Sequence, residues 1–338
     1  MPNSLITVKL PVLIIFAAAG CLAADNTLLW RDPGPVQSLD LAAGPGGPQN
    51  APAGPFTFIE EETTGVSPKI IVKDSRGRKW MVKFGQEAKA ETFASRISWA
   101  AGYPVRASYY VPNGIIEGAP KSGRSEAFLG SNGSFQAARF QKFDDNSFRA
   151  VPGGKLHLAD RREDQQHLNG LKLTLLLVAN WDVKADNTAV FEIDGKQYSV
   201  VSDWGASLGD ANATNRADRK WNCKEYDART ASLIDGVSNG YVQFNYIQYA
   251  ARHEHALSEN IPVEDMKWFV NRMSKLSDNQ LRAGLRASGA TAAEAACFSA
   301  AIRRRLNAFA AAASDSGKGT TTTRTITTTT TRTTKSPR

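Results

Sequence analysis

Alternating apolar and polar residues in the first half of the chain predict short β-strands. Turn-forming residues separate the first three strands into a β-meander. Between the third and the fourth strand, apolar residues recur at helical spacing from 87 to 101, and Gly102 follows as a C-cap. The predicted strands span residues 56–62, 69–74, 79–84, 105–111 and 135–143. This part of the chain is therefore expected to form a small sheet that carries one helix.

The pattern changes after Pro152. Leucine and valine residues occupy nearly all faces of a predicted helix at 163–180, so we expect this helix to be buried. Two strand-like runs, 188–193 and 197–202, flank Asp194-Gly195, which is a strong hairpin signal. From 241 to 313 the pattern is helical. The second part of the chain is therefore expected to be mainly helical.

The N-terminus has the pattern of a secretory signal. Within residues 1–24, Lys9 precedes an apolar run that ends in small residues, which is typical of a signal peptide. Ala-Ala-Gly-Cys21 also resembles a bacterial lipoprotein processing site, in which a lipidated Cys21 would attach the protein to a membrane. Ordinary cleavage near Ala24 is the alternative. We therefore expect an exported protein that is periplasmic, anchored to a membrane as a lipoprotein, or secreted.

Two further segments lack a hydrophobic period. Residues 25–55 are rich in Gly and Pro and are interpreted as a linker that holds the body away from the processed N-terminus. Residues 314–338 consist mostly of Thr, Arg and Lys and cannot form a core, so we interpret them as a disordered tail.

The composition is that of an ordinary soluble protein. The 338 residues are 42% hydrophobic and 22% charged, which excludes a fibre and a wholly disordered chain. The formal net charge is +8, but half of it comes from the tail, and Lys and Arg do not gather on one element with aromatic residues. No specific nucleic-acid partner is expected. Arg303-Arg304-Arg305 is interpreted as the solvated end of a helix. Export would permit a disulfide between Cys223 and Cys297 without requiring one.

Polar side chains fall at particular junctions of the predicted elements. The first lies at the end of the third strand and the second lies one turn into the following helix. Three more share the loop after the buried helix, and the last begins an Asp-Trp-Gly motif at the end of the hairpin. In chain order they are Lys83, Glu91, Asp182, Lys184, Asn187 and Asp203.

In this order, these residues resemble the protein-kinase-like superfamily. Residues 182–187 match its catalytic loop Asp-x-Lys-x-x-Asn, residues 203–205 resemble its Asp-Phe-Gly metal motif, and its third strand supplies a Lys that pairs with a helix Glu. Segments 90–96 and 171–182 look most like the atypical HipA-type and phosphatidylinositol-kinase-like members. The resemblance implies a two-lobed α+β fold, with a β-rich N-lobe at 56–145 and a helical C-lobe at 146–313.

The resemblance also implies a phosphotransferase that moves the γ-phosphoryl group of ATP to a hydroxyl. Catalysis of this reaction consists mostly of positioning and charge neutralisation. Asp182 would accept or orient the proton of the attacking hydroxyl, and Lys184 would neutralise the phosphoryl group in transfer. The acceptor could be a protein side chain, an inositol lipid or a small molecule. Transfer of an AMP group could use the same loops.

The remaining residues would bind the nucleotide and its metal ion. Asn187 and Asp203 would bind Mg²⁺ through oxygen atoms, which that ion prefers. Lys83, held by Glu91, would bind the α- and β-phosphates. The loop that contains Gly65 and Ser67 would bring backbone N–H groups to the phosphates.

The sequence departs from the family at several positions. The phosphate loop has one Gly where the family has three, Trp181 stands where protein kinases usually have Arg, and no Ala-Pro-Glu follows Asp203. A pseudokinase that binds nucleotide, or an interaction module, is therefore an alternative. An exported protein also meets little ATP, unless it acts where nucleotide is present after export.

One alternative belongs to a different class of enzyme. Gly-Ala-Ser207-Leu-Gly matches the nucleophile elbow of serine hydrolases, although a polar loop follows it instead of a helix. His253 and His255 are interpreted as helix-surface residues rather than zinc ligands, because alternate residues of a helix point apart. His157 and His167 are interpreted as structural.

Overall fold

The computed structural model describes residues 27–65, 67–143, 147–245 and 255–315. The expected signal peptide with Cys21, most of the Thr-rich tail and His253 lie outside these residues. In chain order, the strands and α-helices are β1 (Phe56–Glu62), β2 (Lys69–Lys73), β3 (Lys79–Phe84), α1 (Gln86–Ala101), β4 (Ser108–Glu117), β5 (Ser134–Lys142), β6 (Arg149–Val151), α2 (Gln165–Leu177), β7 (Thr188–Ile193), β8 (Lys196–Val201), α3 (Cys223–Ala228), β9 (Ile234–Ser238), β10 (Tyr241–Phe244), α4 (Val263–Met273), α5 (Asp278–Ala287) and α6 (Ala292–Ser314).

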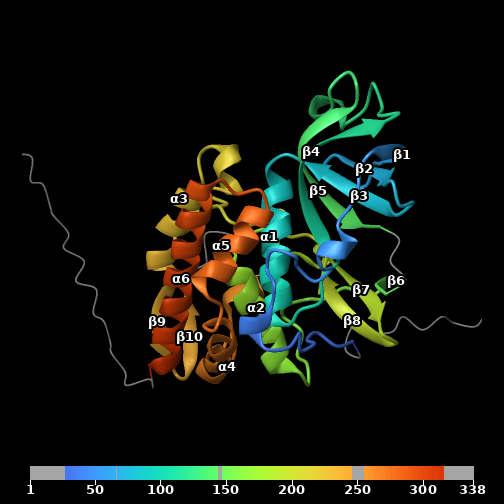
Figure 1. The fold of residues 1–338 in the computed structure, drawn as a ribbon. Helices are drawn as coiled ribbons and strands as arrows, with labels where there is room; N and C mark the ends of the chain where they lie inside the picture. Colours follow the sequence, from blue (N-terminus) through green and yellow to red (C-terminus); the bar gives the residue numbers. More distant parts are fainter. Residues whose placement is uncertain (1–26, 66, 144–146, 246–254, 316–338) are drawn as a thin grey trace, which may run out of the picture.

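The first five strands close into a barrel in the order β1-β2-β3-β5-β4 (Figure 1). Neighbouring strands pair antiparallel, except that a short parallel contact between β1 and β4 closes the barrel. Alternate side chains such as Val82 and Phe140 fill the barrel core, which accounts for the alternating sequence pattern. All five predicted strands are confirmed, although β4 runs on to Glu117, past the predicted end at 111.

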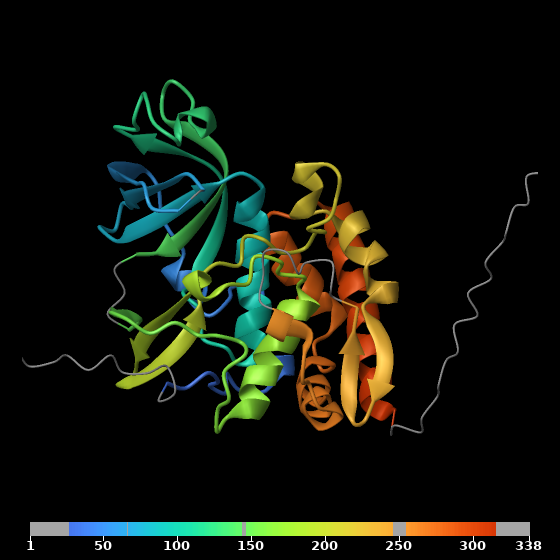
Figure 2. The same cartoon turned by 180° about the vertical axis from the view of Figure 1, so that it is seen from behind.

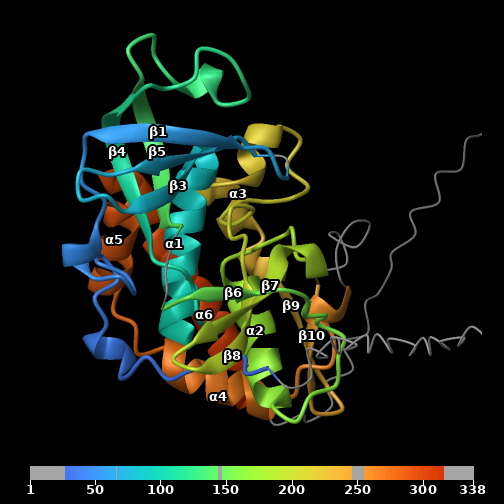
Figure 3. The ribbon, with the colours of Figure 1, turned by 90° about the vertical axis from the view of Figure 1, so that its right-hand side faces the viewer.

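Helix α1 lies between this barrel and the helices of the C-terminal part (Figures 1 and 3). It is buried on nearly all sides, because β4 and β5 cover one face and α2, α4 and α5 contact others. Gly102 ends the helix in a left-handed conformation, with φ of 101°, as predicted. A Cβ atom there would also lie 2.0 Å from Trp30 Nε1, so this position requires glycine for its packing as well as its backbone conformation.

The predicted hairpin after the buried helix is also confirmed. Strands β7 and β8 pair along their whole length, and β6 adds to β7 at the sheet edge. Asp194 and Gly195 both have positive φ, 50° and 74°, as a two-residue hairpin turn requires. Helix α2 is fully buried from Leu168 onward, because its leucines contact the core on all faces. The loop between α2 and β7 is therefore fixed at both ends.

Among the described residues, those from 241 to 244 form a strand, which corrects the prediction of helix from 241 onward. Strands β9 and β10 pair antiparallel beside α6 (Figure 2). Asn239 and Gly240 form the turn between them, with φ of 52° and 80°. Asn-Gly is a strong hairpin signal, and it outweighs the helical spacing that follows. Helices α4, α5 and α6 confirm the helical prediction from Val263 onward, while 246–254 lie outside the described residues.

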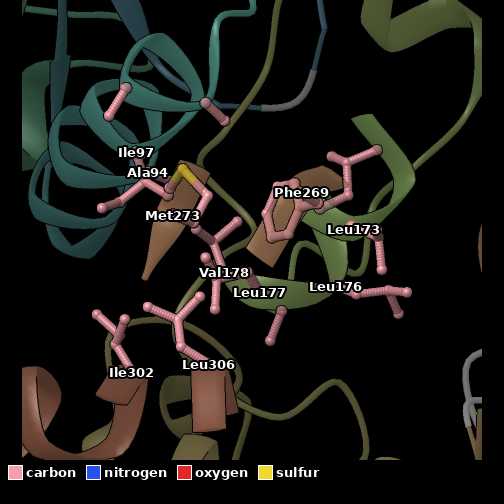
Figure 4. Close-up of a cluster of buried hydrophobic side chains, with 14 of the residues drawn as sticks. Ala94, Ile97, Leu173, Leu176, Leu177, Val178, Phe269, Met273, Ile302 and Leu306 are labelled. Carbon is pink, nitrogen blue, oxygen red and sulfur yellow. The ribbon is translucent and has the colours of Figure 1, made fainter. Parts of the chain in front are cut away.

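The main hydrophobic core lies where four helices meet (Figure 4). Side chains from α1, α2, α4 and α6 point into one cluster, which includes Ile97, Leu177, Met273 and Leu306. The barrel has a separate core of its own. The fold is thus α+β, with a β-rich N-terminal part, which we call the N-lobe and which includes α1, and a mainly helical C-lobe. This two-lobed α+β arrangement agrees with the expectation from the sequence.

The segment 25–55 does not act as a linker over its described residues, so that prediction is wrong. Leu29, Val36, Leu39 and Leu41 are buried in the core of the helical part. Gln280 of α5 donates hydrogen bonds to the carbonyls of two of them, at positions 36 and 39. The Gly and Pro residues are spaced so that single apolar side chains between them reach the core, which no helical or strand period reveals.

The three consecutive arginines also differ from their interpretation. Arg305 is only 1% exposed, lies in the middle of α6, and donates hydrogen bonds to the carbonyls of Leu176 and Tyr226. Arg303 and Arg304 do lie on the surface, where each pairs with an aspartate. None of the described helices combines the length and the apolar character needed to cross a lipid bilayer.

Candidate active site

A cavity of about 740 Å³ opens between the two lobes, and the predicted site residues gather around it. The phosphate loop and β3 line it from the N-lobe, and the loops after α2 and β8 line it from the C-lobe. The lining residues are Gly65, Ser67, Lys69, Lys83, Glu87, Trp181, Asp182, Lys184, Asp186, Asn187, Asp203, Ala206, Arg219 and Lys220. Glu91 is the one predicted residue that does not line the cavity, because it is buried against Lys83.

Lys83 connects the two lobes through carboxylates. Its Nζ lies 3.0 Å from Glu91 Oε2 in α1 and 3.4 Å from Asp203 Oδ2. Burial favours the neutral amine, but the Glu91 and Asp203 carboxylates overcome this effect and raise the pKa of Lys83. Lys83 is therefore a firmly charged ammonium at the wall of the cavity, as the pairing of a strand Lys with a helix Glu predicted.

The Asp203 carboxylate is bound by the Lys83 ammonium group and by the backbone N–H of Gly205. The N–H of Gly205 donates a hydrogen bond of 2.9 Å to Asp203 Oδ1. Burial disfavours the charged carboxylate, but Lys83 and this N–H outweigh burial and lower the pKa of Asp203. A Cβ atom at Gly205 would lie 3.1 Å from Asp203 Oδ1 and 3.2 Å from Glu87 Oε2. Glycine therefore lets the two carboxylates approach the same point.

The loop after α2 is ordered by its own asparagines. Asn180 donates a hydrogen bond to the carbonyl of Asp203 and accepts one from the N–H of Asp182, both at 3.1 Å. Asn187 Nδ2 donates to the carbonyl of Asp182, at 2.6 Å, and to its Oδ2, at 3.1 Å. Asp182 and Asp203 are therefore joined through one buried asparagine, although they are far apart in the sequence. The convergence predicted for this loop is present.

Lys184 lies beside Asp182 on the open side of the cavity. Its Nζ is 3.2 Å from Asp182 Oδ1 and 3.3 Å from Oδ2. Both side chains are partly exposed, so this ion pair is weak and easily exchanged for another partner. A cation that is free to exchange in this way can turn to an anionic ligand in the cavity.

The phosphate loop has the backbone conformation that its single glycine permits. Gly65 has φ of 70°, and its carbonyl accepts a hydrogen bond of 2.9 Å from Arg124 Nη2. Arg124 also binds the carbonyl of Thr63, so one side chain holds the loop from outside. Gly65 and Ser67 then line the cavity as predicted.

Several charged residues of the site were missed by the sequence analysis. Glu87 lies 3.9 Å from Lys83 and forms an ion pair with Lys220. Burial would raise the pKa of Glu87, but Lys220 and Lys83 lower it. Glu87 stands four residues before Glu91 on the same helix face, a spacing that could have identified it. No comparable signal marks Lys69, Arg219 or Lys220, which come from a strand edge and an irregular loop.

Asn187 and Asp203 are the lining residues whose oxygen atoms could hold a metal ion. The amide nitrogen of Asn187 is bound to Asp182, which leaves its amide oxygen available as a ligand. Carboxylate and amide oxygens are hard ligands, and Mg²⁺ usually takes only one or two carboxylates from a protein, with phosphates and water as the others. In the part of the chain that the structure describes, no three His, Cys, Asp or Glu side chains are grouped to hold a metal ion.

The hydrolase alternative is contradicted by burial. Ser207 is 0% exposed, and its hydroxyl makes no hydrogen bond within the described residues. No helix begins directly after Ser207, as a nucleophile elbow would require, because residues 208–215 form a loop. His167 stacks on Trp30 at 5.1 Å and has a structural position, as interpreted. Burial lowers the pKa of His167.

A second cavity, of about 520 Å³, lies against Trp99, Tyr103 and Phe148. It contains none of the predicted site residues, and two of its charged lining residues, Arg31 and Asp194, pair with each other at 2.9 Å. The chemistry that the sequence predicts is therefore confined to the cavity between the lobes.

No protein-family model and no curated protein matches the sequence. Among solved structures, the chain is similar to a Helicobacter pylori proinflammatory kinase, CtkA, at 12% identity over 76% of this chain and 96% of that chain, with a TM-score of 0.45. It is similar to the Golgi casein kinase with Mn/ADP bound, at 10% identity over 78% and 73% of the two chains, with a TM-score of 0.39. It is also similar to HipA of Shewanella oneidensis MR-1, at 11% identity over 79% and 75%, with a TM-score of 0.34. At these identities the similarity concerns the fold alone.

Proposed function

We propose that this protein transfers the γ-phosphoryl group of ATP to a hydroxyl acceptor in the cavity between its lobes. The observation that carries the proposal is the position of Lys83, which pairs with Glu91 and Asp203 and lines the same cavity as Asp182 and Lys184. Five cationic and four carboxylate side chains line the cavity, so it suits a polyphosphate that arrives with a divalent cation.

Different residues of the cavity have different roles in this reaction. Lys83 and the N–H groups around Gly65 bind the phosphates that do not react. Asp182 accepts the proton of the acceptor hydroxyl as its oxygen bonds to the γ-phosphorus and the bond from that phosphorus to the β,γ-bridging oxygen breaks. Lys184 leaves its ion pair with Asp182 and binds the phosphoryl oxygens instead. ADP leaves with the bridging oxygen.

Asn187 and Asp203 would hold Mg²⁺ in this site. When bound, the ion would supply neutralisation of phosphate charge. The low pKa of Asp203 keeps that carboxylate ionised and ready as a ligand. The short distance between Lys83 and Asp203 in the protein alone means that a cation already balances the carboxylate before any ligand enters.

The experiment is incubation of the protein with γ-labelled and α-labelled ATP in parallel. Casein, phosphatidylinositol vesicles and the protein itself serve as acceptors, and released ADP is measured independently of any acceptor. We expect only the γ label to be retained and ADP formation to fall by about 100-fold or more in Asp182→Asn. Asp227→Asn, a surface carboxylate paired with Arg304, is the matched control and keeps its activity.

Retention of the α label instead would identify an AMP transferase. Equal ADP formation by the wild type and by Asp182→Asn would overturn the proposed reaction, because the activity would then not involve the loop after α2. A pseudokinase would bind Mg-ATP without producing ADP.

We further propose that the protein acts after export. The disulfide between Cys223 and Cys297, which joins α3 to α6, supports an oxidising compartment, because such bonds are rare in the cytosol. Attachment to a membrane through Cys21 belongs to the same proposal. Mass spectrometry of the mature N-terminus tests it: a diacylglycerol-modified Cys21 indicates a lipoprotein, a free terminus near Asp25 indicates ordinary cleavage, and an intact Met1 contradicts export by this signal.

A further inference from the structure

Arg139 is a buried cation beside the site that the proposed reaction does not use. It lies at the centre of β5, directly across the sheet from Lys83 on β3. Its neighbours along the strand, Ala138 and Phe140, point into the barrel core. Because side chains alternate along a strand, Arg139 points the other way, on the same side as Lys83. There it meets α1.

Arg139 and Lys83 share one carboxylate. Arg139 Nη2 lies 2.9 Å from Glu91 Oε1, and Lys83 Nζ lies 3.0 Å from Glu91 Oε2. Arg139 and Glu91 are each 1% exposed. Each oxygen of Glu91 therefore has its own cation, one from each of two neighbouring strands.

Stability alone does not explain this arginine. The Nε and Nη1 atoms of Arg139 are buried and donate no hydrogen bond within the described residues. Unsatisfied donors and buried charges are both costly, and apolar side chains usually replace a buried ion pair without loss of stability. By contrast, Arg305, which is equally buried, binds three backbone carbonyls and stacks on Tyr226.

Resting on the function proposed above, we propose that Arg139 is a positioning residue of the nucleotide site. Its own ion pair holds Glu91 in place, so that Lys83 can turn from Glu91 and Asp203 toward the phosphates without leaving an unpaired carboxylate in the interior. Arg139 also balances the charge of this group. The two positive charges of Lys83 and Arg139 balance the two negative charges of Glu91 and Asp203. These four residues therefore present no net negative charge to an incoming polyphosphate.

The electrostatic effect of Arg139 reaches the cavity. Its positive charge acts on Lys69, Lys83 and Asp203, all of which line the cavity. Arg139 and Lys83 each bind a different oxygen of Glu91, so Glu91 keeps one cation when Lys83 turns to a ligand.

The test compares two buried arginines with the same substitution. In Arg139→Met we expect the KM for Mg-ATP to rise by about tenfold or more, with a smaller change in kcat, because phosphate binding loses a nearby cation. Arg139→Lys keeps the charge and should recover most of this loss. Arg305→Met lowers the melting temperature but leaves the KM of the folded protein within about twofold of the wild type.

An unchanged KM in Arg139→Met, measured well below its melting temperature, would overturn the proposal. Arg139→Gln serves if the Met variant does not fold, since it also removes the charge. Failure of the proposed function gives a different result, namely a wild type that binds no Mg-ATP in calorimetry.

Discussion

Lys83 is the side chain on which the candidate site depends most. Its ammonium group lies where strand β3, helix α1 and the end of the β7–β8 hairpin meet. Glu87, Glu91 and Asp203 surround it at 3.0 to 3.9 Å, so its charge is balanced before any ligand binds. Each of these contacts joins residues from different elements, and a change at one of them alters the charge that the others experience.

Removing the ammonium group should affect binding more than folding. In Lys83→Met we expect affinity for Mg-ATP to fall by about 100-fold, since the phosphates lose a charged partner. Lys79→Met, on the same strand but exposed, is the control and should bind as the wild type does. The measurement is the Kd from calorimetry, and equal affinities in the two variants would contradict the role assigned to Lys83.

The pH dependence of stability follows from Asp203. Its pKa in the folded protein lies below the ordinary value of 3.8, so ionised Asp203 stabilises the fold above that value, and the contribution is lost as the pH falls through the folded pKa. We expect the melting temperature of the wild type to drop below about pH 4 more steeply than that of Asp203→Asn. Parallel curves for the two proteins between pH 5 and pH 2 would show that Asp203 carries no such linkage.

The residues that the sequence revealed are those in motifs of fixed spacing. Asp182, Lys184 and Asn187 lie within one loop, so their order alone placed them together. Arg139 could not be found in this way, because the alternation of apolar and polar residues in a strand does not show what covers its polar face. Helix α1 covers that face, which only the packing of the lobes reveals.

At the scale of elements, α3 and α6 are tied by the disulfide between Cys223 and Cys297. The segment before α3 carries Arg219 and Lys220 into the cavity, and Trp221 Nε1 donates a hydrogen bond to Glu294 of α6. The disulfide therefore joins the core helix to a segment that supplies part of the cavity wall. The sequence left this bond open because spacing does not identify a single pair across 74 residues.

Loss of the disulfide should destabilise the protein. We expect Cys223→Ser combined with Cys297→Ser to lower the free energy of unfolding by about 2–4 kcal/mol, the usual effect of a bond that closes a long loop. Urea denaturation of the variant and of the wild type, each with and without dithiothreitol, measures this effect. The reductant should lower the stability of the wild type and leave that of the double variant unchanged. If the double variant is as stable as the oxidised wild type, the disulfide does not stabilise the fold as proposed.

Over the whole molecule, the N-terminal segment connects parts that are distant in the sequence. Leu28 forms backbone hydrogen bonds with β8, Arg272 of α4 donates to the carbonyl of Gly34, and Arg78 of the barrel donates to that of Ala51. One stretch of chain thus touches the hairpin of the site, the C-lobe and the barrel in turn. Its aperiodic pattern gave no sign of this, because it makes its contacts one side chain at a time.

Truncation tests the importance of this segment. A chain that begins at residue 27 should melt at the temperature of the full protein. A chain that begins at residue 52 loses four buried aliphatic side chains, or roughly 6–12 kcal/mol, which is comparable to the whole stability of a typical domain. We expect this shorter chain not to fold stably in circular dichroism. Equal melting temperatures would instead support the original interpretation as a linker.

The central claim is that the cavity between the lobes binds a magnesium nucleotide through Asp203. Isothermal titration of the purified protein with Mg-ATP tests it most directly, alongside Asp203→Asn and the surface control Asp227→Asn. The account predicts saturable binding by the wild type and by Asp227→Asn, and affinity at least about tenfold weaker in Asp203→Asn. No binding by the wild type, or the same affinity in all three proteins, would contradict it.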